Sequence, residues 1–252
     1  MKSKIIIDSV SKSFGDKLIL DKVNLNIEES DSIAILGGSG TGKSVLVKIL
    51  CGLLDQDSGN IIIDGQNTSE ITLRKRSKIL DQIGFLFQNG ALFDSLKVWE
   101  NIAFKLLYKN KIDHKKAMEM AIETLKIVGL NESVKDLNVY ELSGGMRKRV
   151  SLARTIIYNP KIIIFDEPTT GLDPIMSEVI NDLILKCSNL LKATTITITH
   201  DIKSAKKIAN KIFFLYKGKF VWNGSRDDMM SNDDPYINQF VNGFLDGPVK
   251  FN

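Results

Sequence analysis

The sequence predicts an α/β fold built on a parallel β-sheet, with a mainly helical segment inserted into it. Short apolar runs, typical of strands that are covered on both faces, occur at residues 32–36, 83–87, 161–165 and 194–199. Helix-like stretches alternate with these runs, and residues 89–159 are mainly helical in pattern. A chain of 252 residues can form one large domain, or a core that carries a smaller inserted subdomain.

Further strands are expected in the N-terminal part of the sequence and after its last buried strand. Three are expected at residues 4–8, 18–27 and 60–64, where β-type residues are bounded by turn residues. Two late strands are expected at residues 212–215 and 220–222. The organisation is therefore a β-rich start, an α/β core and a helical insertion.

Two apolar stripes at helical spacing define the inserted segment. The first consists of Met118, Ile122, Leu125 and Val128, and Gly129 can end that helix. The second consists of Met146, Val150, Ala153 and Ile157, and it stops before Pro160. Such stripes are usually core, so they predict helices and no chemistry.

The composition is that of an ordinary globular protein, with 43% hydrophobic residues and a net charge of +4. A mildly basic balance fits phosphate ligands or a membrane surface, and alone it does not indicate nucleic acid binding. Cys51 and Cys187 form neither a disulfide pattern nor a metal pair, and two histidines argue against a zinc site. No apolar run approaches the ~20 residues that span a bilayer, so a membrane role would require a partner.

A phosphate-binding loop is predicted between the strand at 32–36 and the helix that follows it. The loop reads Gly37, Gly38, Ser39, Gly40, Thr41, Gly42, Lys43 and Ser44, which fits G-x-x-x-x-G-K-[ST]. Glycines let backbone N–H groups surround phosphates, and the helix N-terminus adds a partial positive charge. Lys43 would approach the β- and γ-phosphates of a nucleotide, and the Ser44 hydroxyl would bind Mg²⁺. The alternative is a glycine-rich turn without a ligand.

Two carboxylates, Asp166 and Glu167, end the apolar run at 161–165. This edge of an open α/β sheet is where ligands bind. Asp166 is a candidate Mg²⁺ partner through water, and Glu167 a candidate general base for the attacking water. Acidic residues in an ordinary strand-end turn are the alternative. Asp173, before Pro174, is also expected to cap a helix.

Two further segments match GTPase motifs. Residues 110–113 read N-K-x-D and residues 81–84 read D-x-x-G. The first lies in a polar helical region before the acidic strand, and the second precedes its strand instead of following it. Both contexts argue against a GTPase.

Residues 142–146, Leu-Ser-Gly-Gly-Met, resemble the signature of ABC transporter ATPases, although the usual last residue is Gln. The resemblance covers residues 4–224 and implies a P-loop ABC ATPase core with an N-terminal antiparallel β subdomain and an inserted helical subdomain. It also implies a head-to-tail homodimer, in which Ser143, Gly144 and Gly145 of one copy meet the P-loop of the other across ATP.

Other positions match the same family in order. The resemblance implies that Phe14 stacks on adenine and that Gln88 contacts Mg²⁺ and senses the membrane partner. It further implies that Asp173 lies in a loop that crosses between protomers, and that His200 contacts the γ-phosphate. For Phe14 the alternative is a strand core residue, and for His200 a structural histidine.

The tail resembles that of Mla-type ATPases, which power phospholipid transport with Mce-domain proteins. The segments that carry this resemblance are residues 234–249 and residues 88–104. It implies a permease, an Mce-domain protein, a small STAS-domain protein, and a peripheral position on the cytoplasmic face of the inner membrane. We expect one ABC ATPase domain at residues 1–225, and a tail at 226–252 that docks on a partner or second protomer through Phe240, Phe244 and Leu245.

Two other functions remain open from the sequence. An importer ATPase for a small polar solute would use identical motor residues. A soluble ABC ATPase acting on nucleic acid or ribosomes usually has tandem cassettes or long coiled-coil insertions, which this sequence lacks, so no direct nucleic acid contact is expected.

Overall fold

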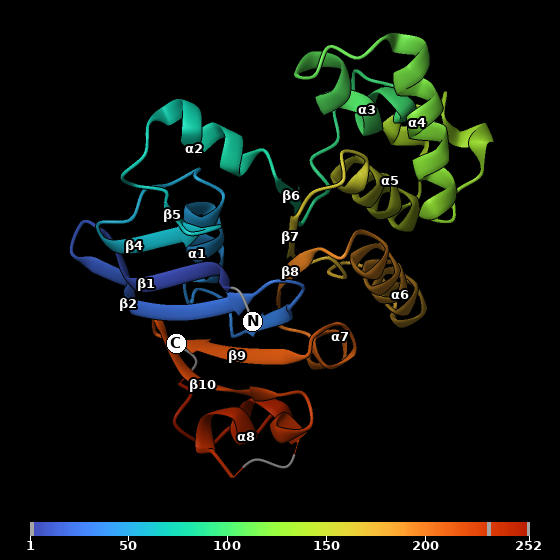
Figure 1. Cartoon of the computed structure of the whole chain (residues 1–252). Coiled ribbons are helices and arrows are strands. Elements are labelled where there is room, and N and C mark those ends of the chain that lie inside the picture. The colour runs from blue at the N-terminus through green and yellow to red at the C-terminus, as the bar shows by residue number, and fades with distance from the viewer. Residues whose placement is uncertain (1–2, 231–232, 251–252) are drawn as a thin grey trace. The chain divides into compact units, whose positions relative to one another are not determined.

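The computed structural model describes residues 3–230 and 233–250 and divides into two compact units. The first unit joins the N-terminal part, up to Asp81, to the C-terminal part from Thr194 onward. The second unit comprises Gln82–Ala193. Figure 1 shows the elements of both units.

The first unit contains an antiparallel sheet with the strand order β2-β1-β4-β5. Its strands are β1 (Ser3–Phe14), β2 (Lys17–Glu28), β4 (Ser58–Ile63) and β5 (Gln66–Asn67). Along β2, Val23, Leu25 and Ile27 are buried and alternate with exposed polar residues. A sheet with one covered face produces this alternation, as the sequence predicted for the β-rich start.

The second sheet of this unit has β3 between β8 and β9, parallel to both, and β10 antiparallel to β9. Its strands are β3 (Ser32–Leu36), β8 (Thr194–Thr199), β9 (Lys211–Tyr216) and β10 (Lys219–Ser225). All six residues of β8 are buried, as are the last four of β3. Neither strand contains a charged residue, and β8 consists only of the β-branched residues Thr and Ile, which explains why the sequence predicted both strands.

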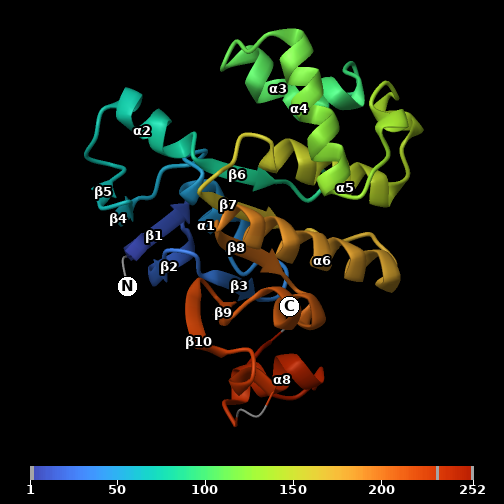
Figure 2. The same ribbon diagram turned by 45° about the vertical axis from the view of Figure 1, so that its right-hand side comes forward.

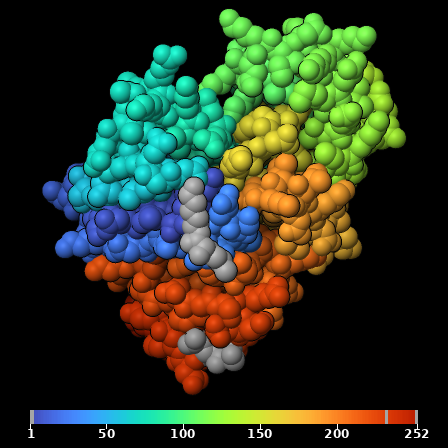
Figure 3. Space-filling model, viewed as in Figure 1, coloured from blue at the N-terminus to red at the C-terminus, as the bar shows by residue number. Residues whose placement is uncertain are grey.

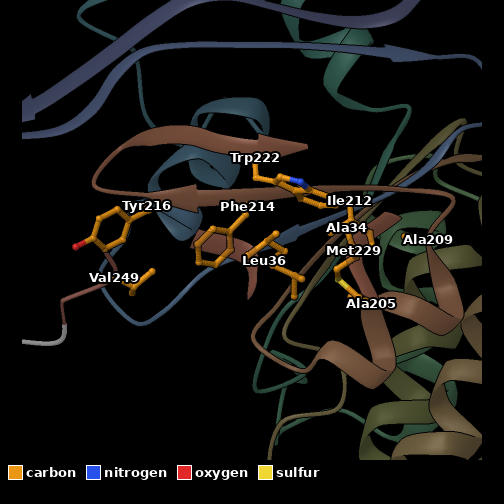
Figure 4. Close-up of a cluster of buried hydrophobic side chains, with 11 residues drawn as sticks. Ala34, Leu36, Ala205, Ala209, Ile212, Phe214, Tyr216, Trp222, Met229 and Val249 are labelled. Atoms are coloured by element: carbon orange, nitrogen blue, oxygen red, sulfur yellow. The ribbon is translucent and has the colours of Figure 1, made fainter. Parts of the chain in front are cut away.

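The helices of the first unit are α1 (Lys43–Leu50), α2 (Leu73–Leu80), α7 (Ile202–Ile208) and α8 (Pro235–Asn242), with a 3₁₀ turn at Asp228–Met230. A buried cluster joins Leu36, Phe214 and Trp222 of the sheet to Ala205 of α7 (Figure 4). Ile237 of α8 belongs to the same cluster. The tail therefore packs on its own chain.

The second unit combines a parallel strand pair, β6 (Ile83–Leu86) and β7 (Ile162–Asp166), with four α-helices. These are α3 (Val98–Tyr108), α4 (His114–Ile127), α5 (Gly144–Ile156) and α6 (Pro174–Leu191), with 3₁₀ turns at Glu132–Val134 and Val139–Glu141. In Figure 2, α3 and α4 lie side by side, and α3 and α4 each contact α5.

The two apolar stripes lie on α4 and α5 as expected. Leu125 and Val128 are fully buried, and α4 ends before Gly129, whose φ of +71° is in the left-handed region. Val150 and Ala153 are fully buried on α5. Cys51 and Cys187 are both free thiols.

Among the described residues, no helix is both long enough and apolar enough to cross a bilayer. Of the apolar tail residues, Phe240 packs on Phe214 at 4.8 Å between ring centroids. Phe244 and Leu245 are 55% and 93% exposed, so docking on a partner or second protomer stays a prediction for them.

Candidate functional site

The phosphate-binding loop connects β3 to α1 in the predicted context. Gly40 and Gly42 have φ values of +75° and +107°, which L-residues rarely adopt. A Cβ at Gly42 would lie 3.0 Å from the Ile19 carbonyl oxygen and 2.9 Å from the Leu20 side chain. Gly42 is also the residue that precedes the first turn of α1. The glycines are therefore required by the shape of the loop.

Lys43, the first residue of α1, is hydrogen-bonded to the backbone of this loop. Its side chain is buried, and its Nζ donates hydrogen bonds of 2.7 Å to the carbonyl oxygens of Gly37 and Gly38. The Thr41 hydroxyl also donates to the Gly38 carbonyl oxygen, at 3.0 Å. A lysine so placed presents its charge to an anion that the loop surrounds.

Ser44 follows Lys43 on the first turn of α1 and has an exposed side chain. Among the described residues, no group of three or more His, Cys, Asp or Glu could hold a metal ion. A Mg²⁺ ion that keeps its waters and binds one or two side chains plus phosphates needs no such group. The exposed Ser44 hydroxyl is one such side chain, and Mg²⁺ bound together with a nucleotide stays a prediction.

His200 leaves the sheet at the same edge as the phosphate-binding loop. Leu36 pairs with Thr199 in the parallel register of β3 and β8, so the residues after both strands emerge side by side. His200 is exposed, and Asp201 behind it caps α7 by accepting hydrogen bonds from the Lys203 N–H and the Ser204 hydroxyl. The structure thus brings together the loop and the predicted γ-phosphate contact.

A cavity of about 570 Å³ adjoins the loop in the first unit. Gly38, Ser39, Gly40 and Thr41 line it, together with Lys17 and other residues. Phe14 and His200 are not among the lining residues. Phe14 ends β1 with a ring that is 52% exposed, which leaves a face available for stacking.

The carboxylates lie in the second unit, at the end of β7. Residues 162–165 are buried, whereas Asp166 and Glu167 are partly exposed. Glu167 has a φ of +48°, an uncommon and costly conformation for a residue with a Cβ. Its carboxylate accepts a hydrogen bond of 3.0 Å from the Thr170 hydroxyl. The backbone therefore holds this side chain in a specific direction.

Lys148 of α5 holds this region together, and the sequence analysis missed it. Its Nζ donates to the carbonyl oxygen of Gln88 at 2.5 Å and to that of Glu167 at 3.3 Å. Burial lowers the pKa of Lys148, and the nearby charges of Glu167 and Asp166 partly oppose that shift. One buried cation thus links the segments that carry two predicted site residues. A lysine between two arginines looks like a solvated face, so only the fold reveals this role.

The signature segment forms the N-terminus of α5. Ser143 caps the helix, because its hydroxyl accepts a hydrogen bond of 3.3 Å from the Met146 N–H. Ser143 and Gly144 are exposed, whereas Gly145 packs against the Met176 side chain. Ser143 and Gly144, at the N-terminus of α5, are therefore accessible to solvent in this chain.

Asp173 caps α6, with Oδ1 accepting from the N–H groups of Ile175 and Met176 at 3.0 and 2.9 Å, as its position before Pro174 predicted. The GTPase-like segments have structural explanations too. Asp113 caps α4, and Asp81 follows the last turn of α2.

Residues 20–170 match the family model described as ABC transporter. The Arabidopsis thaliana protein trigalactosyldiacylglycerol 3, chloroplastic, is 38% identical, over 96% of this chain and 74% of that protein. The Escherichia coli intermembrane phospholipid transport system ATP-binding protein MlaF is 35% identical, over 96% of this chain and 90% of MlaF. A Mycobacterium tuberculosis relative, probable ribonucleotide transport ATP-binding protein mkl, is 37% identical, over 99% of this chain and 69% of mkl.

A solved dimeric ATP-binding cassette, MJ0796, in a post-hydrolysis state bound to ADP and Pi, superposes with a TM-score of 0.80 and 31% identity. The match covers 88% of this chain and 98% of that one. The chain therefore belongs to the ABC transporter family and is an ATP-hydrolysing cassette, which confirms the predicted fold class and ATP as its nucleotide.

The link made by Lys148 predicts a kinetic effect. Replacing Lys148 with Met removes both hydrogen bonds from the carbonyls of Gln88 and Glu167 at nearly constant volume. Leaving these part-buried carbonyl acceptors without a charged donor should lower kcat for ATP hydrolysis about tenfold or more. The KM for ATP should change little, because Lys148 does not belong to the phosphate-binding loop.

Lys148→Arg is the matched variant, since it can still donate to both carbonyls and should recover most of kcat. Steady-state kinetics and a thermal melt of each variant separate this positioning role from general loss of fold. A Lys148→Met protein with a normal melt and a normal kcat would refute the role.

Proposed function

We propose that this chain is the ATPase subunit of an ABC transporter that moves phospholipid between the inner and outer membranes through a membrane permease. We infer the phospholipid cargo from the similarity to MlaF, a protein named for intermembrane phospholipid transport. This similarity extends along 90% of the length of MlaF. The similarity to mkl, named for ribonucleotide transport, favours a polar solute as the competing cargo.

In the proposed reaction, the phosphate-binding loop and Lys43 hold the triphosphate, and Phe14 stacks on the adenine. Ser44, Asp166 and Gln88 would hold Mg²⁺, which would neutralise charge on the phosphate oxygens. Glu167 accepts a proton from the attacking water, and His200 donates a hydrogen bond to the γ-phosphate. The strained backbone of Glu167 and the carbonyl links of Lys148 keep the base oriented.

The site is proposed to require a second copy of the chain. The exposed N-terminus of α5, with Ser143, Gly144 and Gly145, would bind the phosphates held by the partner's loop, while Asp173 lies at the crossing between protomers. The dimeric state of a similar cassette supports this arrangement. The exposure of Ser143 and Gly144 fits it, since both are accessible to another molecule.

An aromatic groove in the second unit is proposed to receive the permease. This cavity of about 460 Å³ is lined by Phe85, Phe87, Phe104, Tyr108 and Tyr158, among others, with Lys105, Lys109 and Arg154. Phe87 is 42% exposed and Tyr108 is 63% exposed. Apolar walls with a cationic rim fit a short amphipathic segment that carries an acidic residue.

The chain is accordingly proposed to work peripherally on the cytoplasmic face of the inner membrane. An Mce-domain protein and a small STAS-domain protein are the further partners that the Mla resemblance implies. No contact with nucleic acid is part of this function.

Replacing Glu167 with Gln should retain ATP binding and lower kcat about 10²- to 10⁴-fold, because the amide cannot accept the proton from water. Glu123→Gln, on an exposed position of α4, is the matched control and should behave like the parent. Phosphate release and equilibrium ATP binding are the two measurements. Hydrolysis near the parent level in Glu167→Gln would exclude this base.

Replacing Tyr108 with Glu should abolish co-purification of the permease from native membranes, because it introduces a charge into the apolar wall of the groove. ATP binding by the purified variant should not change. Leu190→Glu, at an exposed apolar position of α6, is the control and should retain the permease.

The proteins that co-purify with the parent chain decide between the two cargoes. An Mce-domain protein with a multi-span permease supports phospholipid transport. A periplasmic solute receptor would contradict it and favour the importer.

A further inference from the structure

The C-terminal tail folds back along the first unit. Asp234 caps α8 by accepting hydrogen bonds from the N–H groups of Tyr236 and Ile237. The helix then buries Ile237 completely in the cluster of Figure 4. Figure 3 shows the described C-terminal residues, in orange and red, as one continuous packed surface. The tail is thus part of its own cassette.

Gln239 fixes the return of the chain after α8. Its side chain is 3% exposed, and its Nε2 donates to the carbonyl oxygens of Phe244 at 3.1 Å and Val249 at 3.0 Å. Its Oε1 accepts from the Val249 N–H at 2.7 Å. A Cβ at Gly247 would lie 2.3 Å from that oxygen, so the loop closes around the amide. A buried amide with these partners defines one path for residues 243–249.

This path ends at the phosphate-binding loop. Val249 is buried, and the Lys250 N–H donates to the Tyr216 hydroxyl at 2.9 Å. Val249 and Lys250 line the same cavity of about 570 Å³ as Gly38, Ser39, Gly40 and Thr41. The tail therefore contributes to the wall of a cavity that four residues of the phosphate cradle also line.

The turn between β9 and β10 keeps this wall close to the cradle. The Gly218 N–H donates to the Thr41 carbonyl oxygen at 3.3 Å, and a Cβ at Gly218 would lie 2.4 Å from the Ile19 carbonyl oxygen. Lys217, next to Gly218, also lines the cavity. The cavity is consequently bounded by the cradle, this turn and the end of the tail.

The cavity is strongly cationic. Lys17, Lys217 and Lys250 line it, and no Asp or Glu is among its lining residues. All three lysines are exposed, so each can reorient toward a ligand. Three cations beside a glycine-rich cradle fit a polyanion such as the triphosphate of a nucleotide.

We propose that the C-terminal tail is part of the nucleotide site: Gln239 positions its end, and Lys250 supplies a cation to the polyphosphate of the nucleotide bound in the cradle. The proposal rests on the proposed ATPase function. It assigns a nucleotide-binding role to a segment outside the residues matched by the family model.

The test compares ATP affinity among variants of the full chain, measured by equilibrium titration with a fluorescent ATP analogue. Lys250→Ala should weaken binding about threefold, as expected for one exposed charge, and about 0.5 M NaCl should remove the difference. Lys75→Ala, at an exposed lysine of α2 that does not line the cavity, is the matched control and should bind like the parent.

Gln239→Leu should release the end of the tail and weaken binding at least as much. Nucleotide should, in turn, protect the tail of the parent from proteolysis, because the coupling is reciprocal. If Gln239→Leu unfolds, Lys250→Ala still decides the question.

Equal affinities for Lys250→Ala, Lys75→Ala and the parent would overturn the proposal. Lys43→Ala separates this outcome from failure of the ATPase function itself. A parent that binds the analogue no better than Lys43→Ala contradicts the function, whereas Lys43-dependent binding without an effect of Lys250 contradicts the tail's role alone.

Discussion

The hydrogen bonds of a buried lysine ammonium group at the start of α1 hold the loop that is proposed to bind the phosphates of ATP. Lys43 has the carbonyl oxygens of Gly37 and Gly38 as partners, inside a loop in which Gly40 and Gly42 adopt backbone conformations that other residues rarely adopt. Burying a charge is costly unless it is paired, so the loop keeps this cation ready for an anion. The parallel pairing of β3 with β8 then brings His200 to the same edge.

In the second unit, a second lysine also donates hydrogen bonds to two backbone carbonyl oxygens. Glu167 adopts a left-handed backbone conformation, and the Lys148 ammonium group binds its carbonyl oxygen and that of Gln88. A strained catalytic backbone persists only where its surroundings specify it. The proposed general base, Glu167, is thus held through its backbone by a side chain that is assigned no part in proton transfer. The segment of Gln88, proposed to sense the permease, shares the same support.

The parts of the fold that sequence reasoning recovers are those with a strong local pattern. The strands at 32–36 and 194–199 are covered on both faces, and the glycines at 40 and 42 are required by a tight loop. The roles of Lys148 and Gln239 could not be predicted from the sequence, because their hydrogen-bond partners are distant in the chain. Gln88 lies 60 residues from Lys148, and Val249 lies 10 residues from Gln239. The tail shows the same limit: its apolar residues predicted docking, but only the structure shows that Phe240 packs on Phe214 of its own chain.

In the proposed dimer, two copies clamp ATP between the phosphate-binding loop of one copy and the signature segment of the other. Light scattering of the Glu167→Gln protein, with and without MgATP, tests it most directly when Ser143→Arg is added in parallel. The account predicts an ATP-dependent dimer that Ser143→Arg abolishes while each monomer still binds ATP. A Ser143→Arg protein that dimerises with ATP as before would contradict the clamp.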